Sequence, residues 1–305
     1  MPPLLALVGP TASGKSEAGI ALAERLGAEI VSVDSMLVYR GMDVGTAKPT
    51  AEQRRSVAHH LLDVAEPSEP FSVVRFQQLA REAVDGIGAR GVRPLLVGGS
   101  GLYLRAVVDD LEFPGTDPGT RGDLERQADA LGARSMYRRL VGSDPQAAAK
   151  IEPGNVRRTV RALEVAAVTG RTFSSFAKAW EAYPASRMRA VGIEIHREVL
   201  ARRIHLRVAA MLASGLLEEV RTLMARGLGD WFTSSQAIGY AEMARHLQGR
   251  LSLRDALEAT ERRTTGLARR QTAWFRRDPR IRWIRAGEGG AIEVLDELLA
   301  ELEAG

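Results

Sequence analysis

The chain has 305 residues, 45% hydrophobic and 26% charged, a composition typical of a globular protein with about two domains. It has no cysteine, which excludes disulfides and thiolate metal sites, so any metal should be a hard cation bound by oxygen. No apolar run reaches the roughly 18 residues of a bilayer span, and the first residues lack the pattern of a secretion signal. We therefore expect a cytoplasmic protein without membrane contact. A monomer is also expected, although no sequence feature bears on the oligomeric state.

The net charge of +4 is distributed unevenly along the chain. Residues 116–190 carry 13 lysines and arginines against eight acidic residues, and residues 262–285 carry nine arginines against one aspartate. Such clusters bind phosphate backbones by releasing counterions, which makes nucleic acid a candidate partner. Charge alone leaves a solvated basic surface equally open, because a GC-rich genome would also favour arginine.

Strand-like and helix-like segments alternate over the first 111 residues, which predicts parallel βαβ units and an α/β fold. The apolar runs predict strands at Leu4–Val8, Ala28–Asp34 and Pro94–Ser100. Helices are expected from the first loop to about Leu26 and over Phe71–Gly91.

Proline and glycine punctuate a turn after Phe113, and the next 70 or so residues read as helices until AVGIEIH at Ala190–His196. Because both ends of this segment return to the same core, we predict a helical insertion at 113–189 within a core of 1–112 and 190–305. Beyond the insertion we expect helices at Arg197–Ala213, Gly215–Arg226, Ser252–Phe275 and Ala291–Glu303, and a strand at Ile281–Ala286.

The stretch GPTASGKS, Gly9–Ser16, is a complete GxxxxGK[ST] phosphate-binding loop between a predicted strand and a predicted helix. The amides of such a loop surround an anion at the helix N-terminus, Lys15 adds positive charge, and the Ser16 hydroxyl can bind Mg²⁺. The motif does not distinguish a nucleotide from a diphosphate on another carrier.

Asp34 ends the second predicted strand, and the carboxyl ends of parallel strands form the site crevice. We expect it to face the phosphate loop as a metal ligand, a general base or an ordinary helix cap. The third strand runs into Gly98–Gly101, GGSG, where an ordinary P-loop ATPase or GTPase has the acidic residue that holds Mg²⁺. Its absence counts against both of these classes.

Two arginine-rich stretches suit RNA. In NVRRTVRALEV, Arg157 and Arg161 share one helix face. In LARRQTAWFRR, arginines for phosphates are interleaved with Trp274 and Phe275, which could stack on bases. A solvated helix surface and a core position for Trp274 are the alternatives.

Taken together, these motifs resemble the bacterial tRNA dimethylallyltransferases, the isopentenyl-diphosphate:tRNA transferases, over nearly the whole chain. The matching stretches, in the family's order, are GPTASGKS, VSVDSMLVYRGMDVGTAKP, HHLLDV, LVGGSGLYLRAV, RALEV, LASGLLEEVRTLMARG, QAIGYAEM and ARRQTAWFRR. The resemblance implies a P-loop NTPase-like core with an inserted all-helical domain. It also implies Mg²⁺-dependent transfer of a dimethylallyl group from its diphosphate to the exocyclic N6 amine of the adenosine on the 3′ side of the tRNA anticodon.

The resemblance further implies roles for individual residues. Asp34 would be the general base, Thr11 would lie near the bridging oxygen of the diphosphate, and Lys15 and Arg221 would counter its charge, with Ser16 on Mg²⁺. The other diphosphate-binding residues would be Gly9, Pro10, Ala12, Ser13 and Gly14. The implied tRNA contacts are Asp34, Ser35, Met36, Leu37, Ser100, Arg121, Arg157, Arg158, Thr159, Val160, Arg161, Gln236, Gly239, Tyr240, Arg270 and Gln271. The insertion would clasp the anticodon stem-loop, with the target base flipped into a channel.

The chain departs from the family pattern at a few positions. Ser100 stands where threonine is usual and keeps the hydroxyl, whereas Thr265 and Gly266 replace basic residues and Leu267 an aromatic. A C-terminal tRNA contact that is weaker, or shared with nearby arginines, is expected.

Three other functions stay open: an adenylate isopentenyltransferase of cytokinin synthesis, a P-loop small-molecule kinase, and an RNA-binding protein without catalysis. The intact Thr11, Lys15, Ser16 and Asp34 argue against the last.

Overall fold

The chain divides into two units. In the computed structural model, which describes residues 3–185, 188–231 and 233–304, a core unit comprises Met1–Asp109 and Ala185–Gly305, and an insertion unit comprises Asp110–Pro184. The predicted insertion, 113–189, differs from the second unit by a few residues at each end. Its last two residues lie in a core strand and pair with the first strand, so the core resumes earlier than predicted.

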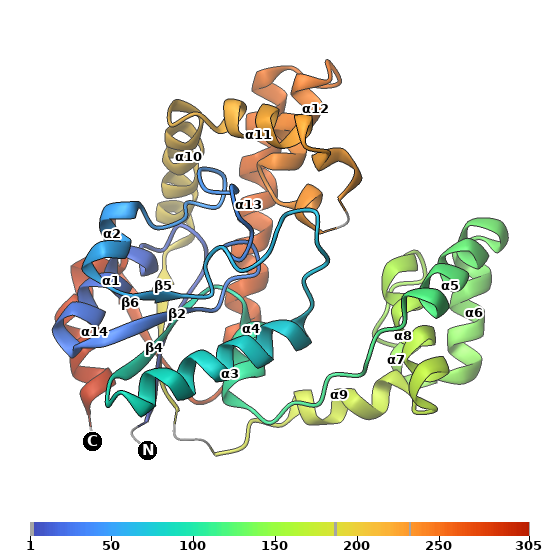
Figure 1. Cartoon of the computed structure of the whole chain (residues 1–305), viewed down its shortest axis with the longest axis horizontal. Coiled ribbons are helices and arrows are strands. Elements are labelled where there is room, and N and C mark those ends of the chain that lie inside the picture. The colour runs from blue at the N-terminus through green and yellow to red at the C-terminus, as the bar shows by residue number, and fades with distance from the viewer. Residues whose placement is uncertain (1–2, 186–187, 232, 305) are drawn as a thin grey trace. The chain divides into compact units, whose positions relative to one another are not determined.

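A six-stranded sheet forms the centre of the core unit (Figure 1). Its neighbouring strands are all parallel, which confirms the predicted α/β fold. In spatial order the strands are β3 (His59–His60), β2 (Ala28–Ser32), β4 (Arg93–Gly98), β1 (Leu4–Val8), β5 (Met188–Ile195) and β6 (Ile281–Ala286). The strand β3 was not predicted, because two residues are too few to show a periodic pattern.

The helices of the core unit agree with the predictions where the predicted segments are long. They are α1 (Lys15–Leu26), α2 (Ala51–Ser56), α3 (Val73–Ala89), α4 (Gly101–Val108), α10 (Arg197–Ala213), α11 (Leu216–Ala225), α12 (Tyr240–Leu247), α13 (Leu253–Phe275) and α14 (Leu295–Glu303). The short helices α2, α4 and α12 were not predicted, and a 3-10 turn at Gly290–Val294 delays the start of α14. In the described ranges, no helix is long and apolar enough to cross a membrane.

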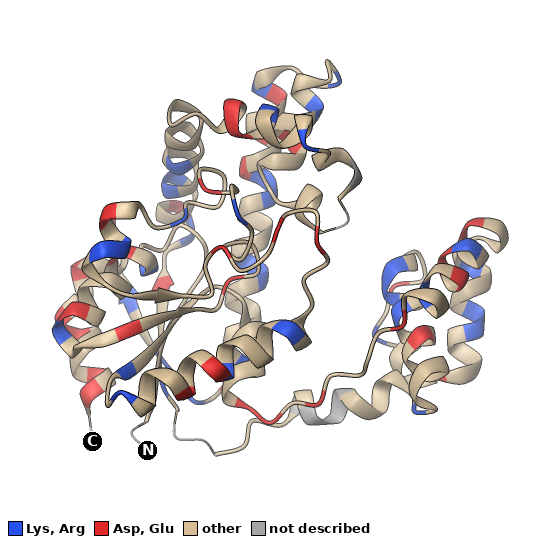
Figure 2. Ribbon diagram, in the orientation of Figure 1, with Lys and Arg blue, Asp and Glu red and all other residues tan. Residues whose placement is uncertain are grey.

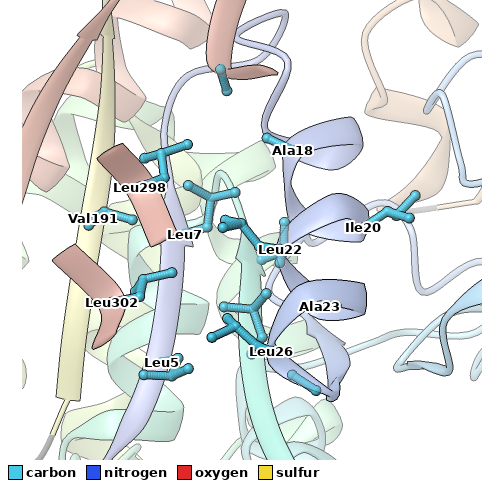
Figure 3. Packing of buried hydrophobic residues seen from close by; sticks show 14 of the residues in the cluster. Leu5, Leu7, Ala18, Ile20, Leu22, Ala23, Leu26, Val191, Leu298 and Leu302 are labelled. Atoms are coloured by element: carbon cyan, nitrogen blue, oxygen red, sulfur yellow. The ribbon is translucent and has the colours of Figure 1, made fainter. Parts of the chain in front are cut away.

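The main hydrophobic core lies between β1, α1 and α14 (Figure 3). Leu22 and Leu26 are four residues apart on α1, so both side chains lie on the face that packs toward Leu7 of β1. Leu298 of α14 belongs to the same buried cluster. Each such leucine contributes about 1.5–3 kcal/mol by leaving water, so this core holds the strand and the helix on either side of the phosphate loop.

Helices are the only regular elements of the insertion unit in its described residues, as predicted. Its helices are α5 (Pro118–Leu131), α6 (Ala133–Ser143), α7 (Pro145–Ala148), α8 (Val156–Thr169) and α9 (Phe173–Glu181). Leu124, Leu140 and Leu163 form part of a separate buried cluster, so this unit has its own core. Figure 2 shows lysines and arginines on several of these helices and along α13.

Candidate active site

Three loops leave the same edge of the core sheet. In the parallel register Val8 lies beside Gly98, and Ser32 lies beside Val97, so β1, β2 and β4 end together. The phosphate loop follows β1, the segment containing Asp34 follows β2, and the GGSG turn follows β4. A Cβ atom on Gly98 would lie 2.3 Å from the carbonyl oxygen of Val33, so only glycine permits this close approach.

The phosphate loop has the backbone of an anion site. Gly14 has a φ of 84°, in the left-handed region that favours glycine, and α1 begins at the next residue. Lys15 and Ser16 line a cavity of about 400 Å³ beside the loop. The ammonium of Lys15 donates to the carbonyl oxygen of Pro10 at 3.2 Å, which turns this side chain back over the loop.

Residues from the C-terminal half of the core hold the phosphate loop in place. Arg203 of α10 donates through Nε to the carbonyl oxygen of Ala12 at 2.8 Å. The amide of Ala291 donates to the carbonyl oxygen of Ser13 at 2.9 Å. The sequence pattern indicated no role for either residue, because nothing in a helical period identifies which arginine meets a distant carbonyl.

Burial lowers the pKa of Lys15 to about 8. The Asp34 carboxylate opposes this shift, and the positive charge of Arg207 adds to it. The three side chains thus form one electrostatic group, in which a carboxylate lies among two cations.

Arg207 of α10, rather than Arg221, is the arginine of this site. Its Nη2 donates to the carbonyl oxygen of Thr46 at 3.2 Å, and its side chain lines the cavities beside both the phosphate loop and Asp34. Burial lowers the pKa of Arg207, against the opposing charge of Asp34. Arg221 of α11 lines none of these cavities; its side chain is 58% exposed and pairs with Glu218. The structure thus does not bring Arg221 to the phosphate loop, and its diphosphate role stays a prediction.

A second cavity, of about 310 Å³, collects six of the predicted tRNA-binding residues. They are Asp34, Ser35, Met36, Gln236, Arg270 and Gln271. Thr11 and Arg207 line the same cavity, together with apolar side chains that include Ile204, Val208, Met211 and Leu267. A small cavity between this one and the phosphate loop is lined by Leu37, Lys15, Ser16 and Asp34. Polar and apolar side chains thus share the wall of this cavity, a lining that suits a small organic group with hydrogen-bonding edges.

The cavity of about 310 Å³ is called the base cavity below. Two hydrogen bonds fix its polar side chains. Asp34 accepts through Oδ1 from the amide of Met36 at 2.9 Å, which orients the carboxylate. The amide of Thr11 donates to Oε1 of Gln271 at 2.8 Å, so α13 is tied directly to the phosphate loop. Glycine at position 99 leaves room for this carboxamide, because a Cβ there would lie 2.4 Å from Nε2 of Gln271.

Four of the predicted tRNA contacts have no surface for RNA. Tyr240 and Gly239 are buried at the start of α12, and Thr159 and Val160 are buried in the core of the insertion unit. Ser100 lines none of the cavities described above; its hydroxyl caps α4 by accepting from the amide of Tyr103. The family stretches that suggested these contacts contain folding residues as well as surface residues, and sequence alone does not separate the two.

The predicted arginines of the insertion unit also fall into two groups. Arg121 and Arg161 bind the fully buried carboxylate of Glu164, at 2.6 Å and 2.8 Å. Arg161 donates in addition to the carbonyl oxygens of Pro114 and Gly115, so both arginines brace the start of this unit. Arg157 and Arg158 are exposed and are the ones placed to meet a partner.

The described residues contain no group of three or more histidine, cysteine or acidic side chains that could hold a metal. Ser16 is the one hydroxyl of the phosphate loop that lines the cavity beside it. Such a donor fits Mg²⁺, which takes oxygen ligands and binds through one or two protein groups together with substrate phosphates.

Comparison with known proteins assigns the family. A family model described as IPP transferase matches residues 37–278, and one described as isopentenyl transferase matches residues 2–67. A tRNA dimethylallyltransferase of Streptomyces coelicolor is 47% identical over 293 residues, which cover 96% of this chain and 93% of that protein. The chain belongs to the tRNA dimethylallyltransferase family. The resemblance seen in the motifs is thereby confirmed.

Solved structures of the family share the fold. The tRNA isopentenylpyrophosphate transferase of Bacillus halodurans is 39% identical with a TM-score of 0.71, and the match covers 100% of this chain and 98% of that one. A eukaryotic dimethylallyltransferase acting on tRNA is 26% identical with a TM-score of 0.78, over 96% of this chain and 77% of that one. The P-loop NTPase-like core that the motifs predicted is the fold of this family.

Proposed function

We propose that this chain transfers a dimethylallyl group from dimethylallyl diphosphate to the N6 amine of the adenosine on the 3′ side of the tRNA anticodon. The observation that carries this function is the wall shared by two adjoining cavities. Thr11, Asp34 and Arg207 line both the base cavity and the small cavity that contains Lys15 and Ser16. A diphosphate on one side and an adenine on the other would meet at this wall.

The chemistry of the transfer follows from the charges at the wall. As the bond from N6 to the prenyl carbon forms and the bond from that carbon to the diphosphate oxygen breaks, the amine loses a proton and the diphosphate gains negative charge. Asp34 would accept the proton. Lys15, Arg207 and the amides of Gly9–Ser16 would stabilise the leaving diphosphate, and such preorganised groups are usually the largest contribution to catalysis.

Mg²⁺ would be held by the hydroxyl of Ser16, with the remaining ligands supplied by the diphosphate and water. When bound, the ion would neutralise part of the diphosphate charge. The protein residues have a separate task, which is to hold the diphosphate against the phosphate loop and exclude water from the wall.

RNA would be recognised by groups outside the wall. The adenosine must leave its stack to enter the base cavity, where Arg270 and Gln236 are available to the flanking nucleotides. The exposed Arg157 and Arg158 of the insertion unit would contact backbone phosphates of the anticodon stem-loop. A tRNA substrate agrees with the prediction of a cytoplasmic enzyme, and a monomer stays a prediction.

The decisive experiment is mass analysis of the nucleosides of an anticodon stem-loop RNA after incubation with dimethylallyl diphosphate and Mg²⁺. The expected product is one adenosine heavier by a dimethylallyl group, at the position 3′ to the anticodon. Parallel incubations contain adenosine monophosphate in place of RNA, or labelled ATP in place of the prenyl donor. Prenylated mononucleotide without prenylated RNA, or transfer of label from ATP, would overturn the proposal in favour of the adenylate isopentenyltransferase or the kinase.

A further inference from the structure

A single carboxylate of α11 holds the loop that leads from Asp34 toward the phosphate site. Glu219 accepts three successive backbone amides: those of Asp43 at 2.9 Å and Val44 at 2.8 Å through Oε2, and that of Gly45 at 3.1 Å through Oε1. Oε1 also accepts from the phenol of Tyr240 at 2.5 Å. Amide groups that would otherwise need water thus converge on one charged acceptor, and such charge-assisted bonds are roughly twice as strong as neutral ones.

The ring of Tyr240 sets how closely this loop can approach. A Cβ atom on Gly45 would lie 2.4 Å from the ring, so the backbone rests directly on the aromatic face. Tyr240 is fully buried, and burial, reinforced by the neighbouring Glu219 carboxylate, raises the pKa of its phenol. The phenol therefore stays protonated and keeps donating to Glu219.

The far end of the same loop has an anchor of its own, Lys48. The buried ammonium of Lys48 donates to the carbonyl oxygen of Tyr39 at 2.6 Å and pairs with Asp43 at 2.6 Å and Asp63 at 2.7 Å. The residues between the two anchors, Thr46 and Ala47, have little freedom to move.

These middle residues face the reaction site. The carbonyl oxygen of Thr46 accepts from Arg207, and Thr46 lines the base cavity, while Ala47 lines the cavity beside the phosphate loop. Arg207 has no ion-pair partner within 4.0 Å among the described residues, so the hydrogen bond to this carbonyl is what directs its side chain. The position of the guanidinium thus depends on where the carbonyl of Thr46 stands.

We infer that Glu219 is a positioning residue for the prenyl transfer: it fixes the Asp43–Ala47 loop and, through the Thr46 carbonyl, the guanidinium of Arg207. This inference rests on the proposed function for the identity of the reaction, although its geometry does not. In Glu219→Gln one acceptor oxygen becomes an amide donor that faces backbone N–H groups, so the loop and Arg207 shift while the side-chain volume is kept.

The test is a double-mutant cycle between Glu219→Gln and Arg207→Lys, measured as the single-turnover rate of prenyl transfer to the stem-loop RNA. A displacement of this kind far from the bond-forming atoms should lower the rate between about 10- and 100-fold in the otherwise unchanged enzyme. In the Arg207→Lys protein, Glu219→Gln should lower the rate less than about twofold, because substitutions at coupled residues do not have additive effects. The Michaelis constant for RNA should stay the same throughout.

Two further variants separate positioning from loss of folding. Glu218→Gln is the matched control, because the adjacent side chain is exposed and pairs only with Arg221 in the described structure; it should leave the rate unchanged. Tyr240→Phe keeps the ring against Gly45 and removes one donor to Glu219, so it should lower the rate about two- to tenfold, the value of one hydrogen bond. The thermal midpoint of each variant is measured alongside.

The inference is overturned if Glu219→Gln lowers the rate by the same factor in both backgrounds, or leaves it unchanged. The same cycle is measured on the binding of inorganic pyrophosphate, which needs no RNA and reports on Arg207 directly. If the protein without substitutions binds pyrophosphate but transfers no prenyl group, the proposed function is overturned and the role of Glu219 is not. If the effects of Glu219→Gln and Arg207→Lys on pyrophosphate binding are additive, the role of Glu219 is overturned and the proposed function is not.

Discussion

At the residue scale, the site combines one carboxylate with two cations at the carboxyl edge of the sheet. Asp34, Lys15 and Arg207 come from three different elements, and the Asp34 carboxylate opposes the lowering of the pKa of both Lys15 and Arg207 by burial. In the proposed reaction the base gains a proton while negative charge develops on the diphosphate. A carboxylate next to two cations suits both changes. Each member can be tested separately.

Asp34 is expected to act on the proton and not on the diphosphate. Asp34→Asn preserves the shape of the side chain and an oxygen for the Met36 amide, but removes the base. We expect the rate of prenyl transfer to fall by about 10²–10⁴-fold, the usual contribution of a general base, with pyrophosphate affinity nearly unchanged. Single-turnover kinetics and calorimetry measure the two quantities, and a fully active variant would eliminate Asp34 as the base.

Arg207 and Arg221 provide a matched pair of arginines. Arg207→Gln should lower the rate of transfer by about 10²–10³-fold, because it removes one preorganised donor from the leaving group. Arg221→Gln should stay within about twofold of the unchanged enzyme, because this side chain is exposed and its ion pair with Glu218 is worth little. The reverse order in a steady-state assay would restore Arg221 as the diphosphate ligand.

The lowered pKa of Lys15 predicts a pH dependence of diphosphate binding. Its ammonium is mostly charged near pH 7 and loses its proton as the pH rises through about 8, well below the usual range of a lysine. The inhibition constant of inorganic pyrophosphate should therefore increase between about pH 7 and pH 9, as the cation is lost. Lys15→Arg keeps its charge over this range and should give a flatter profile. Equal slopes for both proteins would assign the effect to another group.

At the scale of elements, sequence patterns predicted what long periodic segments determine. The strands β1, β4, β5 and β6 and the helices α10 and α13 follow from apolar runs and helical spacing, and the P-loop motif located the site. The positions of individual side chains depend on tertiary contacts. A helical period does not reveal that Arg207 lines the cavities while Arg221 faces solvent. The burial of Tyr240 likewise depends on Gly45, almost 200 residues away in sequence.

A buried ionic network joins two of these elements. Asp109, at the end of α4, pairs with the 1%-exposed Arg105 of that helix and with Arg280, which follows α13, at 2.6 Å. Asp109→Ala should lower the free energy of unfolding by about 3–5 kcal/mol, because it removes a buried carboxylate that pairs with both Arg105 and Arg280. Urea denaturation measures this, with Asp85→Ala on the exposed face of α3 as the control. A decrease no greater than that of the control would show that the network adds little.

At the scale of the whole molecule, two units with separate cores divide the task. The core unit contains the three cavities of the site, and the insertion unit carries exposed arginines on a helix whose Glu164 is paired with Arg121 and Arg161. Under the proposed function, this arrangement would allow RNA affinity and prenyl transfer to be altered independently.

Replacing both Arg157 and Arg158 with alanine should raise the Michaelis constant for RNA and leave that for dimethylallyl diphosphate unchanged. The dependence of RNA binding on salt should also become less steep, by up to about 0.7–0.9 logarithmic units for each phosphate that the variant no longer neutralises. Binding titrations over a range of salt concentrations measure the slope. The control replaces Arg138 and Arg139 of α6, and an equal effect there would indicate a general charge effect instead of a defined contact.

The phosphate loop is among the first parts of the chain to be synthesised, yet its partners are among the last. The carbonyl oxygen of Ala12 accepts from Arg203, the amide of Thr11 donates to Gln271, and the carbonyl oxygen of Ser13 accepts from the amide of Ala291. All three partners are synthesised much later than the loop. A nascent chain that has completed its first strand and helix therefore lacks the groups that fix the loop between them. The phosphate loop therefore gains its full set of contacts only after Ala291 has been synthesised, when the helical insertion has already been made.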